Sequence, residues 1–192
     1  SYPYGKHSNY AAYTTAQGAW QRLEFKMTDI PDKYTGSFKV DKIVMMFDPG
    51  IQSGNTWYFD NLRTGQSGAD APILSKTILE DCEGNSTITL RASNGTYAKV
   101  GNPSATGINT TPNVIKYTRN GAEKNDQISY KVQIDDASVF RDGTNTVSFD
   151  VYTTAPAGKV ISLHFEDSTI VATSANWEAP MHSIYEGRVE KS

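Results

Sequence analysis

The chain has 192 residues, of which 38% are hydrophobic, and a formal net charge of −3 with no block of basic residues. This length suits one β-sandwich or two small domains, and the charge balance excludes nucleic-acid binding through a basic surface. No apolar run approaches the length that crosses a bilayer, so we expect no membrane insertion. Cys82 is the single cysteine, which excludes an internal disulfide.

Alternation of apolar and polar residues with a period of two recurs along the chain, whereas helical periodicity does not. The first clear strand is expected at 20–27, and a more uniformly apolar stretch at 40–48 predicts a central strand. Further strands are expected at 54–63, 78–85, 128–134, 147–152, 160–165 and 183–189. Short strands separated by Asn-Gly and Asp-Gly turn signals predict an all-β fold, an antiparallel β-sandwich of jelly-roll type.

The order of segments in the middle of the chain is unusual. Residues 54–63 read like the last strand of a secreted β-sandwich module, and 78–85 read like a first strand. A linker rich in Gly, Ser, Ala and Pro, 64–77, separates them. We therefore expect one module over 1–192, with closing strands in 1–63 and opening strands in 78–192. Either circular permutation or a cut out of phase through a tandem array explains this order.

Short motifs from both halves resemble a known family. The segments Ile78–Asn85, Gly107–Thr110 and Val114–Tyr117 resemble the opening of jelly-roll carbohydrate-binding modules. The segments Tyr4–Tyr10, Trp20–Phe25 and Trp57–Asn61 are similar to the closing part of such modules. The family belongs to secreted polysaccharide-degrading and surface proteins, notably of Bacteroidetes, so the resemblance implies a secreted or cell-surface bacterial protein with further domains. The chain departs from the pattern in its permuted order and at Cys82, where the family usually has an aromatic residue.

The resemblance implies a structural calcium ion. In modules of this type, acids from the first and last strands meet at one edge of the fold and form an oxygen cage, which suits a hard cation. The matching residues are Asp60, Asp81 and Glu83, and alternation places Asp81 and Glu83 on the same side of their expected strand. The alternative is that these acids are solvent-facing strand ends.

Carbohydrate binding needs an aromatic ring for the apolar face of a sugar and polar groups for its hydroxyls. The candidates are Lys6, His7, Tyr10, His164 and Trp177. The first three lie in the family-like segment, His164 points away from the apolar side of its strand, and Trp177 lies in loop-like sequence. The alternative is that the tyrosines cover strands and that Trp177 closes an edge.

A catalytic centre is not indicated. The Glu-x-Asp-x-x-Glu pattern of jelly-roll glycosidases is absent, and the three histidines show no metal-ligand spacing. We therefore expect a non-catalytic module, not an enzyme, that binds a polysaccharide or oligosaccharide. A structural spacer or adhesin repeat without ligand is the alternative, and a small polysaccharide lyase or hydrolase is a further one. Trp20 is assigned to the core, and Trp57 is left open between core and surface.

Overall fold

The computed structural model describes residues 9–26, 40–66, 76–135, 140 and 145–166. These ranges contain eleven strands and no α-helix. The strands are β1 (Asn9–Tyr13), β2 (Gln21–Lys26), β3 (Val40–Phe47), β4 (Thr56–Gln66), β5 (Lys76–Glu80), β6 (Leu90–Ala92), β7 (Thr96–Gly101), β8 (Asn113–Thr118), β9 (Gln127–Ile134), β10 (Asn145–Thr153) and β11 (Val160–Glu166). The all-β prediction is confirmed.

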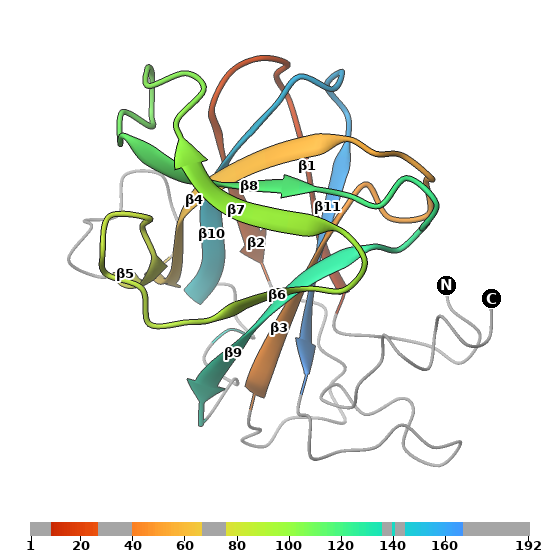
Figure 1. Ribbon diagram of the computed structural model, residues 1–192. Helices are drawn as coiled ribbons and strands as arrows, with labels where there is room; N and C mark the ends of the chain where they lie inside the picture. Colours follow the sequence, from red (N-terminus) through yellow and green to blue (C-terminus); the bar gives the residue numbers. More distant parts are fainter. Residues whose placement is uncertain (1–8, 27–39, 67–75, 136–139, 141–144, 167–192) are drawn as a thin grey trace, which may run out of the picture.

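The strands form two antiparallel sheets that pack against each other as a β-sandwich (Figure 1). The five-stranded sheet has the order β1-β11-β3-β9-β6. The six-stranded sheet has the order β2-β10-β4-β8-β7, with β5 paired to β4 outside this path. Because successive strands often lie in different sheets, most neighbours within a sheet are far apart in sequence.

Aromatic side chains fill the space between the sheets. Phe47 of β3, in the five-stranded sheet, packs against four rings of the six-stranded sheet at centroid distances of 5.3–6.5 Å. These rings belong to Trp57, Phe59, Tyr117 and Phe149. Trp57 is fully buried, so the question left open for this residue is answered in favour of the core.

One core contains side chains from both halves of the chain. Phe59 and Leu62 precede the predicted linker, Leu79 and Ile115 follow it, and all four belong to the same buried cluster. The ends of the chain, Ser1 and Ser192, lie outside the described residues, as does the strand expected at 183–189.

The predicted linker is shorter than expected. Strand β4 continues to Gln66 and β5 begins at Lys76, and the two pair antiparallel, with Thr64 opposite Thr77. The small residues of this stretch suggested a tether, but backbone hydrogen bonds in a sheet require no particular side chain. Only residues 67–75 remain as the connection, and these lie outside the described ranges.

The strand expected at 78–85 also ends early, at Glu80. The Asp81 carboxylate accepts hydrogen bonds from the backbone N–H groups of Glu83 at 2.9 Å and Asn85 at 3.1 Å, which closes a turn. Cys82, inside this turn, has a positive φ of 58°. The expectation that Asp81 and Glu83 lie on one side of a strand is therefore wrong.

Candidate ligand-binding face

The residues predicted to bind carbohydrate are only partly described. Lys6, His7 and Trp177 lie outside the described residues. Tyr10 lies on β1, although its side chain is not among those described. His164 lies on β11 and is 0% exposed, so in this structure its ring is not on the surface. These candidates therefore form no described site.

Side chains on the outer face of the six-stranded sheet are identified by alternation along the strands. Trp57 and Phe59 on β4 both belong to the core, so Tyr58 between them points outward. On β8, Lys116 points outward because its two neighbours are core residues. Tyr152 of β10 follows the core residue Val151 and also points outward. Tyr58, Lys116 and Tyr152 are all half-buried.

Strand register brings these outward side chains into one row across the sheet. Tyr58 is opposite Lys116 on β8 and opposite Tyr152 on β10. The rings of Tyr58 and Tyr152 meet edge to face, with centroids 5.9 Å apart. Tyr152 in turn contacts Trp20, just before β2, at 5.6 Å. We call Lys116, Tyr58, Tyr152 and Trp20 the aromatic row; across four strands it spans about 14 Å.

Trp20 is buried, as its assignment to the core predicts, but it is not a member of the cluster between the sheets. It is 8% exposed, but it lies at the end of the aromatic row. Its indole N–H donates to the carbonyl oxygen of Ser104 at 2.8 Å and to Oδ1 of Asn102 at 3.1 Å. The loop between β7 and β8 therefore covers Trp20 from outside. These hydrogen bonds satisfy the indole N–H, so Trp20 is stably buried at a position outside the cluster between the sheets.

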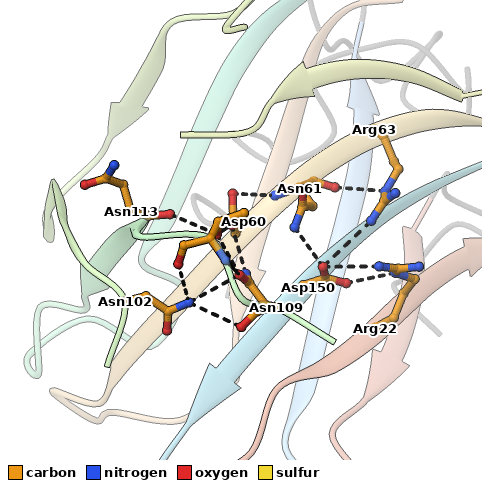
Figure 2. Close-up of polar contacts among 9 residues, drawn as sticks. Arg22, Asp60, Asn61, Arg63, Asn102, Asn109, Asn113 and Asp150 are labelled. Atoms are coloured by element: carbon orange, nitrogen blue, oxygen red, sulfur yellow. Dashed lines mark hydrogen bonds and ion pairs between the residues drawn. The ribbon is translucent and has the colours of Figure 1, made fainter. Parts of the chain in front are cut away.

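Figure 2 shows a charged cluster on the same sheet, formed by Arg22, Asn61, Arg63 and Asp150. The Asp150 carboxylate is fully buried and accepts hydrogen bonds from Nε of Arg22 at 2.8 Å and Nδ2 of Asn61 at 2.9 Å. The guanidinium of Arg63 lies 3.7 Å away and is also buried. Burial lowers the pKa of Arg63, and the nearby Arg22 lowers it further, whereas Asp150 opposes this change. The cluster joins β2, β10 and β4 on the same outer face as the row, because Asp150 lies between the core residues Phe149 and Val151 and therefore points outward.

Asp60 lies next to this cluster and has a different set of partners. Its carboxylate accepts hydrogen bonds from Nδ2 of Asn109 at 2.8 Å, Oγ1 of Thr111 at 2.6 Å and the backbone N–H of Asn61 at 2.7 Å. Asp60 is 0% exposed. Burial raises the pKa of Asp60, and this effect outweighs the hydrogen bonds, which lower it. The partners are neutral donors, and two of them come from the β7–β8 loop.

The arrangement around Asp60 does not fit a calcium ion. Calcium requires six to eight oxygen ligands. The Asn109 amide faces Asp60 with its nitrogen, because its Oδ1 accepts the backbone N–H of Thr111 at 3.1 Å. The Glu83 carboxylate is bound to Asn113 at 2.9 Å, and Asp81 closes its own turn. Within the described ranges, no group of three His, Cys, Asp or Glu side chains is arranged to hold a metal ion.

The comparisons with known proteins identify no relative. No protein-family model, no curated protein and no solved structure matches the chain. Over the described residues, no helix is long and apolar enough to cross a membrane.

Proposed function

We propose that this chain is a non-catalytic carbohydrate-binding β-sandwich, of jelly-roll type, that holds its ligand on the outer face of the six-stranded sheet. The aromatic row carries this proposal. Two half-buried tyrosines and one half-buried lysine lie side by side on the outer face of the sheet, and Trp20 lies at the end of the row. Stacked rings beside hydrogen-bonding groups suit the apolar faces and hydroxyls of sugars.

The chemistry of the row favours binding over catalysis. The polar groups that the row offers to a ligand are the ammonium group of Lys116 and the hydroxyls of the two tyrosines. The two nearest carboxylates, Asp60 and Asp150, are each 0% exposed and engaged by other side chains. A glycosidase needs two carboxyl groups that reach the scissile bond. Export of the parent protein, and its attachment to further domains, belong to the same proposal and rest on the sequence resemblance.

A shallow, wet site with few anchors binds with a dissociation constant of roughly 10 µM to 1 mM. Affinity gels loaded with algal, plant and fungal polysaccharides, followed by calorimetry on the retained one, measure this binding. Loss of a stacking ring should cost about 1–3 kcal/mol, by analogy with bases stacked on aromatic side chains. We therefore expect Tyr58→Ala and Tyr152→Ala each to weaken retention by about 5- to 150-fold.

Tyr13→Ala is the matched control, because Tyr13 is 62% exposed and lies on β1 of the other sheet. It should leave retention unchanged. Equal effects of Tyr13→Ala and Tyr58→Ala would place the site elsewhere. Failure of the unmodified chain to retain any polysaccharide would favour a spacer without ligand. Release of reducing ends or unsaturated products from a retained polysaccharide would favour an enzyme.

A further inference from the structure

The loop 102–112, between β7 and β8, is organised by its own amide side chains. The backbone N–H of Asn102 donates to the carbonyl oxygen of Pro112 at 2.9 Å and closes the loop. Inside it, the Asn102 side chain accepts from Ser104 N–H at 2.9 Å and donates to the carbonyl oxygen of Thr111 at 2.9 Å. Asn109 is 1% exposed within the loop. The loop therefore has a defined conformation of its own.

This loop is attached to the sheet at two separated points. At one point, Asn109 and Thr111 donate to the Asp60 carboxylate on β4, as Figure 2 shows for Asn109. At the other, Ser104 and Asn102 accept from the indole of Trp20 near β2. Asp60 is two residues beyond Tyr58 on β4, and Trp20 ends the aromatic row. The loop therefore runs along one side of the row.

We propose that Asp60 is a positioning residue, which holds loop 102–112 in place through hydrogen bonds and without a metal ion. The loop held in this way borders the ligand face and selects among polysaccharides. This inference rests on the proposed function, since a border selects only if the row binds. Ile108 is 49% exposed and Thr106 is exposed, so the loop presents apolar and hydroxyl groups to the solvent. A fixed border of this kind favours unbranched chains, because a branch on that side of the row meets the loop.

The attachment is tested first without any ligand, by hydrogen exchange of the backbone amides. Asp60→Asn replaces one acceptor oxygen with an NH₂ group and removes the charge. Thr111→Val removes the hydroxyl that donates to Asp60, and Thr110→Val is its matched control, because Thr110 is exposed in the same loop. We expect exchange within the loop to accelerate at least ten-fold, or about 1.4 kcal/mol, in Asp60→Asn and Thr111→Val but not in Thr110→Val. Unchanged loop exchange in both test variants would overturn the positioning role.

A calcium titration decides between the hydrogen-bond network and an ion. We expect excess calcium and EDTA to give the unmodified chain the same melting temperature and the same loop exchange. A calcium-dependent rise in melting temperature that disappears in Asp60→Asn would show that Asp60 is a metal ligand and would overturn the inference.

Selection is tested with a linear and a branched polysaccharide that share one backbone. In Asp60→Asn and Thr111→Val, retention of the branched chain should rise relative to the linear one, whereas Tyr58→Ala should weaken both. An unchanged ratio in the two loop variants would overturn the role in selection. If the unmodified chain retains neither polysaccharide, the proposed function and the selective role fail together, while the exchange measurement still decides the attachment.

Discussion

Replacement of Asp150 by alanine tests whether the charged cluster beside the aromatic row stabilises the fold. Asp150 is 0% exposed, and it is the acid that Arg22 and Arg63 share. The Arg63 side chain is only 8% exposed, so Asp150→Ala removes the acid with which this buried guanidinium forms its ion pair and leaves it only the weaker attraction of Asp60. Breaking a buried ion pair by removing one partner costs about 3–5 kcal/mol. This is a large part of the roughly 5–15 kcal/mol that stabilises a typical protein.

Urea unfolding followed by tryptophan fluorescence measures this cost, because Trp20 and Trp57 are both buried. For a chain of this size, each kcal/mol lowers the melting temperature by about 2–4 °C, which gives a decrease of about 6–20 °C. Arg22→Ala should cost less, about 1.5–3 kcal/mol, because Asp150 keeps the partners Asn61 and Arg63.

The double variant Asp150→Ala, Arg63→Met separates a buried, unpaired charge from a loss of packing. With the uncompensated guanidinium removed, the double variant should be more stable than Asp150→Ala alone. If the double variant is equally or less stable, or if Asp150→Ala costs under about 1 kcal/mol, the reasoning from an unpaired buried charge is refuted.

Three further predictions concern the turns that join the strands. Gly95→Ala places a Cβ 2.5 Å from Oδ2 of Asp126 and from the carbonyl oxygen of Thr118. Urea unfolding should therefore show that the free energy of unfolding decreases by about 1–3 kcal/mol. Gly101→Ala is the control, because the added Cβ meets nothing within 4 Å and the free energy of unfolding should hardly change. Burial raises the pKa of Asp126, but hydrogen bonds from Asn120, Ser93 and Asn94 outweigh it, and the net pKa lies below the ordinary value. Asp126 therefore stabilises the fold above about pH 4, and this stabilisation is lost as the pH falls through the pKa of the folded state. In Asp126→Asn, the free energy of unfolding should therefore decrease less between neutral and acidic pH than in the unmodified chain. An unaltered decrease would contradict this. The Arg119 guanidinium donates to the Ser53 hydroxyl and to the backbone carbonyls of Asp48, Ile51, Glu123 and Lys124. Arg119→Ala should therefore lower the free energy of unfolding by at least about 2 kcal/mol. An unchanged free energy of unfolding would show that water replaces the guanidinium.

The sequence by itself determined the fold class and the direction of many side chains. Period-two alternation depends only on residues adjacent in the chain, because successive side chains of a strand point to opposite faces. Alternation therefore predicted which side of a strand is apolar, and the four positions Leu23, Phe25, Phe59 and Phe149 are all core residues. The same alternation separates Tyr58 from its two core neighbours. The turn at Asp81 was missed because Asp81 and Glu83 were interpreted as alternate positions of a strand that continues from Ile78. Asp81, Gly84 and Asn85 are residue types that are depleted in strands and common in turns, and this was the signal for the turn.

Only the tertiary structure decided which outward side chains are neighbours. Tyr58 and Tyr152 are far apart in the chain, and they meet because β4 pairs with β10 in one particular register. A shift of that register by one residue would move every side chain of a strand to the opposite face, and no local pattern specifies the partner strand. Asp60 is the same case: the resemblance placed it at one edge of the fold, but only the tertiary structure brings the amide of Asn109 and the hydroxyl of Thr111 to its carboxylate.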